Sequence, residues 1–193
     1  RQMCIRDSPK LLKENNVVNS LISSIDIAPT LLDIAEIEIN DNFQGKSFYK
    51  LIKNPNQKFR NYVFAEHNWH DYESYQRMVR NDRYLYIVNS RPEFPQEGPL
   101  DAINSPTYID LKTAQKNNTI TKIQAEIFIQ PRQAEELYDL SNDPYQFNNL
   151  ISSEKIEDEY LLLKNIINNW ITETGDSEPT QITTDWYLRE QEP

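Results

Sequence analysis

The stretch YQRMVRNDRYLYIVN, residues 75–89, decides the fold of the region in which it lies. Residues 75–80 and 83–89 are rich in aromatic and β-branched side chains, which are typical of strands. The polar pair Asn81-Asp82 between them suits a two-residue turn. The pattern therefore predicts an antiparallel hairpin.

Two shorter strands are predicted on either side of this hairpin, at 61–66 and 136–140, with a polar helix or insertion near 107–127 before the second. Ser153 can then cap a helix that runs to about residue 172. Its apolar residues recur at helical spacing: Ile156, Tyr160, Leu163, Ile167, Trp170 and Ile171. A few antiparallel strands followed by one helix predict a small α+β unit.

The segment before the strands contains one predicted helix. Pro29 suits its first turn, and Asp26 lies just upstream, where a carboxylate favours the positive end of a helix. Its apolar face would hold Ile27, Leu31, Ile34 and Ala35. Polar residues follow, and they indicate a domain boundary near 53–60.

Composition excludes several classes of protein. The chain has 193 residues, 30 acidic and 20 basic, and so a formal net charge of −10, which argues against general nucleic-acid binding. Its single Cys can form neither an internal disulfide nor a thiolate zinc site. No stretch is apolar for long enough to span a membrane. A small anionic substrate remains compatible with this negative net charge, because a local pocket can be positive on an acidic protein.

The richest cluster of chemically useful side chains is EHNWHDYE, residues 66–73, which holds both histidines of the chain after a predicted strand. As a substrate-contact loop it offers His67, His70 and Trp69, and such loops concentrate recognition groups. As a metal site it would need about three converging ligands, for which spacing alone is no evidence. A polar connection is the third interpretation. We favour substrate contact.

Other candidates are weaker. Cys4 has flanks that do not indicate a nucleophile. Arg77, Arg80 and Arg83 lie close in sequence, but alternation along the strand favours a solvated hairpin surface over an anion clamp. The run 139–144 lacks the alternating oxygen ligands and the Gly of a calcium loop, so it is interpreted as a structural turn.

Taken in order, these segments resemble the C-terminal part of the sulfatase family. The matching stretches are SSIDIAPTLLDIA (23–35), QGKSF (44–48), RMVR (77–80) with RYLYI (83–87), and ELYDL (136–140) with Asp143-Pro144 and Asn149-Leu150. The resemblance covers about residues 9–172. Glu36 stands where relatives often have Gly, and Gln146 where Glu is usual.

Within the sulfatases, the chain is most similar to the heparan N-sulfatases, or sulfamidases. The residues that carry this likeness are Ser8-Pro9, Val63-Phe64, Asn89, Pro95, 99–101 and 105–107. In sulfamidase-like enzymes the loop that matches residues 67–71 faces the substrate pocket. The resemblance therefore implies that His67 and His70 bind substrate.

The resemblance also implies a fold and a division into parts. The parent would be an α/β enzyme with the alkaline-phosphatase-like sulfatase fold. Residues 9–58 would end its α/β domain, residues 59–174 would form the C-terminal α+β domain with an antiparallel sheet and a C-terminal helix, and residues 175–193 would be an acidic tail. Residues 1–8 match no helical or strand period, and we set them apart as a segment that need not be native to the fold.

The implied activity is hydrolysis of a sulfamate or sulfate ester on a glycosaminoglycan-type sugar, with calcium and a formylglycine nucleophile. The family makes formylglycine from Cys or Ser in a C/S-x-P-x-R context, which Cys4-Ile5-Arg6-Asp7-Ser8 does not match. No catalytic or metal-binding residue is therefore carried over. We expect a chain that lacks the N-terminal catalytic domain and is inactive alone.

The expected partner is a sulfated sugar, with neither nucleic acid nor membrane, and the family's locations are periplasmic, secreted or lysosomal. Two alternatives stay open: a non-enzymatic glycan-binding or assembly module, and a phosphoryl-transfer enzyme of the alkaline-phosphatase superfamily. If residues 9–50 pack on a sheet outside this chain, we expect Leu21, Ile25, Leu31 and Ile34 to be exposed.

Overall fold

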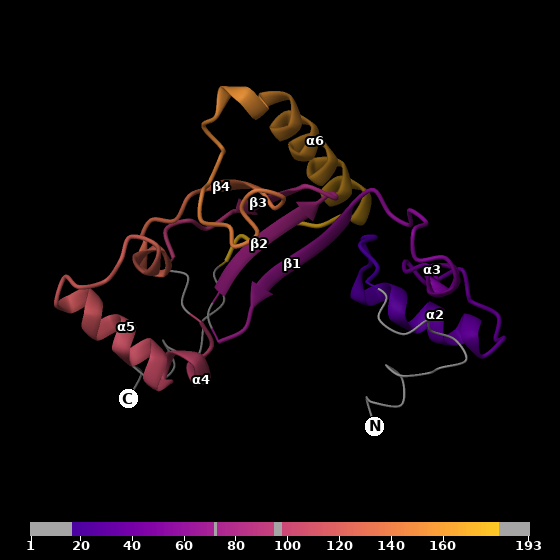
Figure 1. Cartoon of the computed structure of the whole chain (residues 1–193), viewed down its shortest axis with the longest axis horizontal. Helices are drawn as coiled ribbons and strands as arrows, with labels where there is room; N and C mark the ends of the chain where they lie inside the picture. The colour runs from indigo at the N-terminus through magenta and orange to yellow at the C-terminus, as the bar shows by residue number, and fades with distance from the viewer. Residues whose placement is uncertain (1–16, 72, 95–97, 182–193) are drawn as a thin grey trace. The chain divides into compact units, whose positions relative to one another are not determined.

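Strands β2 (Glu73–Arg80) and β3 (Tyr84–Asn89) form the predicted antiparallel hairpin in a computed structural model that describes residues 17–71, 73–94 and 98–181 (Figure 1). Its turn is displaced by one residue from the prediction. The Asn81 N–H donates to the Tyr84 carbonyl at 3.0 Å, so the two turn residues are Asp82 and Arg83. The Asn81 side chain stabilises this turn, because its Oδ1 accepts from the backbone N–H groups of Arg83 and Tyr84 at 2.8 and 2.6 Å.

The hairpin is the centre of a four-stranded sheet with strand order β1-β2-β3-β4. Strand β4 (Glu135–Asp139) pairs antiparallel with β3 and sets Ile87 opposite Glu136. Strand β1 (Val63–Trp69) lies at the other edge. It begins two residues later than predicted and extends through the histidine cluster as far as Trp69, so the prediction that a loop begins at His67 is wrong.

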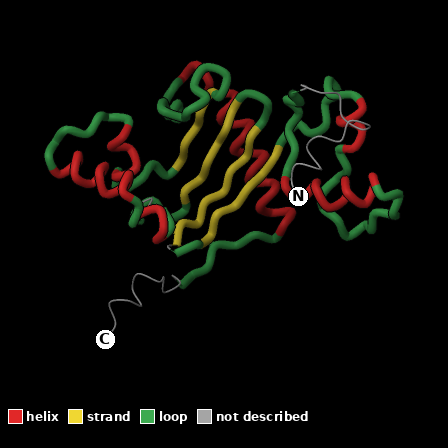
Figure 2. Tube along the Cα trace, turned by 60° about the horizontal axis from the view of Figure 1, so that its bottom comes forward, coloured by secondary structure: helices red, strands yellow, loops and turns green. Residues whose placement is uncertain are grey.

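Helix α6 (Glu157–Thr174), preceded by the short helix η3 (Glu154–Ile156), lies along one face of this sheet (Figure 2). The fully buried residues between helix and sheet are Val79, Tyr86, Leu137, Leu163 and Ile167. Two of them lie on the predicted apolar face of the helix. The prediction of an α+β unit with an antiparallel sheet and a C-terminal helix is confirmed.

The connection from β3 to β4 carries helices α4 (Leu100–Ile103), α5 (Pro106–Lys116) and η2 (Gln124–Phe128). Helix α5 begins as its sequence dictates, with Pro106 at the first position and the Ser105 hydroxyl accepting from the Tyr108 N–H at 3.3 Å. The Tyr108 and Phe128 rings pack with their centroids 5.8 Å apart. No helix within the described ranges has the length and hydropathy needed to cross a bilayer.

The chain divides into two compact units at Val63, and the first is organised around Asp26. It holds the helices η1 (Ser24–Asp26), α2 (Ile27–Ile34) and α3 (Tyr49–Lys53). The fully buried Asp26 carboxylate pairs with the Arg60 guanidinium and accepts from the backbone N–H groups of Ser23 and Lys46, both at 2.8 Å. Asp26 is thus the centre of a buried ion pair, not merely a charge near a helix end.

Gly45 is required for this arrangement. A Cβ atom at Gly45 would lie 1.9 Å from the Ile25 carbonyl oxygen, so any side chain would push apart the backbones that converge on Asp26. The Thr30 hydroxyl ties the same segments together, because it donates to the Asp26 carbonyl at 2.6 Å and accepts from the Phe48 N–H at 3.0 Å.

The apolar face of this unit is only partly as expected. Ile25 and Leu31 are half exposed in the chain, as predicted, and Ile22 and Ile27 are exposed with them. Leu21, however, is buried, so the prediction that it is exposed is wrong.

A truncation on α6 tests the packing of helix against sheet. We expect Leu163→Ala to lower the free energy of unfolding by about 2–5 kcal/mol, because it removes buried methyl groups and leaves a cavity. Leu162→Ala, one residue earlier and 45% exposed, is the matched control and should cost less than about 1 kcal/mol. Urea unfolding followed by tryptophan fluorescence measures both. Equal losses would contradict the helix face assigned here.

The Asp26 ion pair predicts a dependence of stability on pH. Burial raises the pKa of Asp26, but the hydrogen bonds from Arg60, Lys46 and Ser23 outweigh it and hold this pKa below its usual value. The stabilisation is therefore complete above the unfolded-state pKa of about 3.9 and is lost as the pH falls through the lower folded pKa.

We expect Asp26→Asn to cost about 3–5 kcal/mol near neutral pH, because it leaves Arg60 without its carboxylate. The variant should also lose much of the pH dependence below about pH 4. Asp41→Asn, at an exposed position, is the control. Urea titrations followed by circular dichroism measure both effects. If the free energy of unfolding of Asp26→Asn fell below about pH 4 as steeply as that of the wild type, the ion pair would not be the source of this pH dependence.

Candidate functional site

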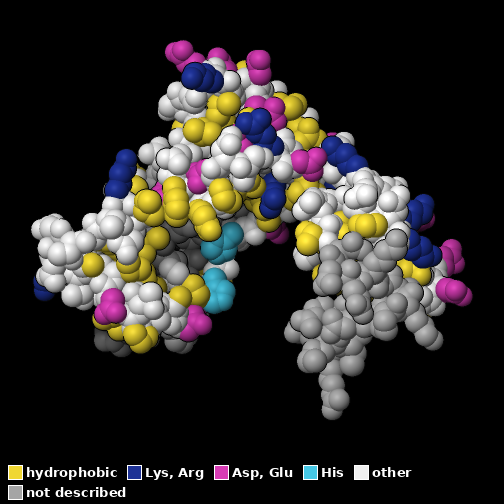
Figure 3. Space-filling model, viewed as in Figure 1, with side chains coloured by type: hydrophobic (Ala, Val, Ile, Leu, Met, Phe, Trp, Pro, Cys, Tyr) yellow, Lys and Arg dark blue, Asp and Glu magenta, His cyan; other side chains and the backbone are white. Residues whose placement is uncertain are grey.

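The face of the sheet opposite α6 is hollowed into a pocket of about 910 Å³ (Figure 3). Its floor comes from the strands, its far wall from the α5–η2 segment, and a third side from residues 145–149. The two histidine side chains lie at its rim.

Strand alternation explains which side chains reach the pocket. Successive residues of a strand point to opposite faces, so Val79 and Tyr86 enter the core under α6 while Gln76, Met78 and Ile87 line the open face. The pairing register of Met78 with Ile87, and of Ile87 with Glu136, carries this set across three strands.

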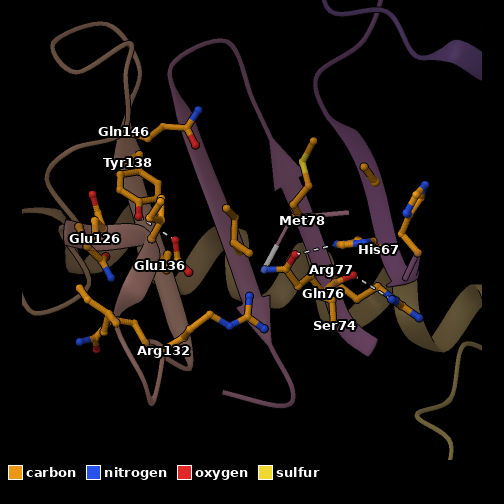
Figure 4. Close-up of a pocket in the computed structure, with 18 of the residues that line it drawn as sticks. His67, Ser74, Gln76, Arg77, Met78, Glu126, Arg132, Glu136, Tyr138 and Gln146 are labelled. Atoms are coloured by element: carbon orange, nitrogen blue, oxygen red, sulfur yellow. Dashed lines mark hydrogen bonds between the residues drawn. The ribbon is translucent and has the colours of Figure 1, made fainter. Parts of the chain in front are cut away.

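A row of hydrogen bonds joins polar side chains of all four strands, and Figure 4 shows its two ends, between His67 and Gln76 and between Tyr138 and Glu136. The His67 Nδ1 lies 3.2 Å from the Gln76 Oε1, and the Gln76 Nε2 donates to the Asn89 Oδ1 at 2.6 Å. The Asn89 Nδ2 donates to the Glu136 Oε1 at 2.6 Å. The Tyr138 hydroxyl donates to the Glu136 Oε2 at 2.7 Å. Both carboxylate oxygens of Glu136 are therefore occupied.

The direction of these bonds fixes the tautomer of His67. A carboxylate only accepts, so Asn89 donates to Glu136 and offers its oxygen to Gln76, which in turn offers its own oxygen to His67. The His67 Nδ1 therefore carries a hydrogen, and in the neutral ring the Nε2 is left as an acceptor. Burial, with Glu136 as acceptor, raises the pKa of Tyr138, so that its hydroxyl stays a donor.

His70 lies in the short connection between β1 and β2 and is largely exposed. Its Nδ1 is 3.2 Å from the Asp71 Oδ2, which also accepts from the Leu100 N–H at 2.6 Å. Asp71 thus ties the β1–β2 connection to the start of α4. The structure brings both predicted substrate-binding residues, His67 and His70, to the same pocket.

The three neighbouring arginines do not converge. Arg77 is buried and makes a bidentate pair with Asp176 at 2.5 and 2.9 Å. Arg83 pairs with Asp139 at 2.6 Å, and Arg80 is exposed at the end of β2. This arrangement agrees with the interpretation that they do not form an anion clamp.

The run 139–144 forms the structural turn that its sequence predicts. The Asp139 carboxylate accepts from Arg83, from Asn142 and from the Ser141 N–H, as in a structural turn. Across the part of the chain that the structure describes, no three His, Cys, Asp or Glu side chains gather as a metal ion would require. Cys4 lies outside the described residues.

Sequence reasoning missed Arg132, which lines the same pocket and is only 8% exposed. Its Nε donates to the Phe94 carbonyl at 3.1 Å, but its two terminal nitrogens are buried and have no hydrogen-bond partner in the structure as described. Burial lowers the pKa of this guanidinium. Arg132 follows a proline in an irregular stretch, where no periodicity distinguishes a buried cation from a solvated one.

Comparison with known proteins gave matches over most of the chain. The family model for the C-terminal region of N-sulphoglucosamine sulphohydrolase matches residues 2–98. An ulvan-active sulfatase from Formosa agariphila is 31% identical over 170 residues, which are 87% of this chain and 28% of that protein. The N-acetylglucosamine-6-sulfatase of Bos taurus is 29% identical over 151 residues, which are 74% of this chain and 24% of that protein.

A solved structure of a protein bound to its substrate, D-glucosamine-2-N,6-O-disulfate, matches with a TM-score of 0.54. The identity is 19%, and the match covers 89% of this chain and 28% of that one. At this identity the likeness shows the fold alone. The chain thus spans about a quarter of the length of these proteins.

The hydrogen-bond row makes a prediction about His67. We expect nitrogen NMR of the wild type to report a hydrogen of His67 on Nδ1, where the Gln76 oxygen accepts it. Gln76→Ala removes the acceptor that holds it there, so the ring should shift towards a mixture with the Nε2–H form. Gln115→Ala, at an exposed position on α5, should leave the spectrum unchanged. A hydrogen on the Nε2 of His67 in the wild type, in place of Nδ1, would contradict the hydrogen-bond row from His67 to Tyr138.

Proposed function

Because this chain belongs to the N-sulphoglucosamine sulphohydrolase C-terminal family and corresponds to the C-terminal part of a sulfatase, we propose that its pocket forms part of a sugar-binding site. The enzyme would hydrolyse sulfamate or sulfate ester groups of glycosaminoglycan-type sugars. The observation that carries the proposal is the pocket on the open face of the sheet, with His67 held by Gln76.

The chemistry of the pocket suits a sugar ring. Carbohydrate hydroxyls need directional donors and acceptors, and the row from His67 to Tyr138 presents such groups in fixed orientations. Aromatic side chains, among them Tyr108 and Phe147, supply apolar surface on the other sides of the pocket. His67, with its Nε2 as an acceptor, and the exposed His70 would contact the substrate.

Two of the comparisons support a sulfated glucosamine as the sugar. One relative is an N-acetylglucosamine-6-sulfatase, and one protein of the same fold was solved with glucosamine disulfate as its substrate. Both support a sulfated glucosamine as the class of substrate. The family description names N-sulphoglucosamine, whose sulfo group is on nitrogen, so it favours sulfamate over sulfate ester as the group that is hydrolysed.

We assign neither calcium nor formylglycine to the described residues. They provide no cluster of metal-ligating side chains. Ser90 and Ser177 are each followed two positions later by Pro, but Phe94 and Gln181 stand where the C/S-x-P-x-R pattern needs Arg. The role that we propose for this chain is therefore to bind and orient the sugar, and we expect the chain alone to release no sulfate.

A binding experiment tests this role. We expect the chain to bind glucosamine 2-N,6-O-disulfate, and His67→Ala to raise the Kd about three- to tenfold, because one hydrogen bond is lost. His70→Ala should have a smaller effect in the same direction, because that ring is largely exposed. Gln115→Ala, outside the pocket, is the control. Isothermal titration calorimetry measures all four proteins.

The outcomes separate the alternatives. Equal affinity for glucosamine and its disulfate would favour a glycan-binding module without sulfatase specificity. Sulfate release by the chain itself, in the presence of calcium, would contradict the assignment of a binding role alone. Unchanged affinity in both histidine variants would remove these residues from the site.

A further inference from the structure

Arg132 is a buried cation whose terminal nitrogens lack partners, and this is unusual. A guanidinium carries five N–H donors, and removing them from water is unfavourable unless acceptors replace the water. Only the Nε of Arg132 is satisfied, by the Phe94 carbonyl at 3.1 Å. The Nη1 and Nη2 atoms are buried and have no hydrogen-bond partner in the described structure. These two nitrogens carry four of the five N–H donors, and together they can pair with both oxygens of an anion in a bidentate contact.

The side chains around Arg132 do not supply that anion. Glu136 and Glu93 lie near enough to act on its charge, but neither accepts a hydrogen bond from its terminal nitrogens in the described structure. Both carboxylate oxygens of Glu136 already accept hydrogen bonds, from Asn89 and Tyr138. Arg77, the other arginine that lines the pocket, is in the opposite situation, because Asp176 satisfies it bidentately. The pocket therefore contains one cation that is already neutralised and one that is not.

The position of Arg132 directs the free donors into the pocket. In Figure 4 its side chain extends from the β4 side of the pocket towards the part of the floor that holds Ser74 and Gln76. A ligand that lay across the hydrogen-bond row would thus meet the guanidinium on the same floor.

We propose that Arg132 binds an acidic group, sulfate or carboxylate, of the saccharide that occupies this pocket. The inference rests on the proposed function for the nature of the ligand, and on the burial and unpaired nitrogens of Arg132 for the contact. Glu126 and Glu136 also line the pocket, and their charge disfavours a free inorganic anion. A sugar can satisfy both kinds of group, because its hydroxyls can donate to the Glu126 carboxylate while its acidic group accepts from Arg132.

Arginine variants of the full chain test the contact. We expect Arg132→Gln to weaken binding of glucosamine 2-N,6-O-disulfate at least tenfold while affinity for unsulfated glucosamine changes less than twofold. Arg132→Lys should be intermediate, because it keeps the charge but loses the planar pair of donors. Arg80→Gln removes the same charge from the exposed end of β2 and should change neither affinity. Calorimetry measures the series.

A second arm identifies the acidic group. A disaccharide of a uronic acid and unsulfated glucosamine presents a carboxylate in place of sulfate. If Arg132→Gln weakens binding of this disaccharide as much as it weakens binding of the disulfate, Arg132 binds either anion. If only the disulfate responds, the group is sulfate.

Thermal stability and NMR distinguish the loss of a ligand contact from a failure of the variant to fold. We expect Arg132→Gln to keep or raise the Tm, because it removes an uncompensated buried charge, whereas a purely structural arginine would lower it. In the wild type, saturating disulfate should shift the Arg132 Nε–H resonance, which requires no substitution. An unmoved resonance would overturn the proposal whatever the variants do.

The two proposals fail in different ways. If the disulfate binds and depends on His67 but not on Arg132, the sugar-binding role stands and the Arg132 contact is wrong. If no sugar binds but inorganic sulfate shifts the Arg132 resonance, an anion site exists and the sugar-binding role is wrong.

Discussion

The packing of α6 against one face of the sheet is the constraint on which the site depends. Leu163 and Ile167 bury Val79, Tyr86 and Leu137, so one face of β2, β3 and β4 is fixed as core. Because strand side chains alternate, the next residues along the same strands must point to the other face. A register shift by one residue would exchange the two sets. The apolar core therefore holds the polar row of the pocket in its register.

The open face shows how buried amide hydrogen bonds can fix the geometry of a polar row. Asn89 is 2% exposed, and its amide gives one hydrogen to Glu136 and the other to the Gln133 carbonyl while its oxygen accepts from Gln76. Satisfied buried amides of this kind specify geometry, because any displacement leaves a donor or an acceptor without a partner. His67 lies at the end of this row, and its ring is exposed, but its Nδ1 is held by the hydrogen bond to Gln76.

The hairpin and the C-terminal helix could be predicted from sequence because each depends on a local period, two in the strands and about 3.6 in the helix. The extent of β1 was not predictable in this way, since Glu66, His67 and Asn68 are polar residues on an edge strand whose side chains are exposed. Asp26 has the sequence position of a helix-end charge, and its pairing with Arg60, 34 residues away, leaves no mark in the local sequence. Both departures from the family pattern, Glu36 and Gln146, have left-handed backbones with φ of 57° and 60°. A left-handed backbone is one that Gly adopts more readily than Glu, so the resemblance to sequences with Gly at position 36 has a physical reason.

Arg132 shows the limit of pattern reasoning most clearly. The formal charge of −10 indicates that the molecule repels anions at long range, yet the field that a ligand meets depends on which charges are already paired. Arg77 and Arg83 are balanced by Asp176 and Asp139, so they contribute little to the field in the pocket. The terminal nitrogens of Arg132 have no hydrogen-bond partner in the described structure and are shielded from solvent, where the attraction of this cation for an anion is less screened than at the surface. Because Glu126 and Glu136 line the same pocket, it favours a ligand that brings hydroxyl donors together with an acid, which is the combination that a sulfated sugar carries.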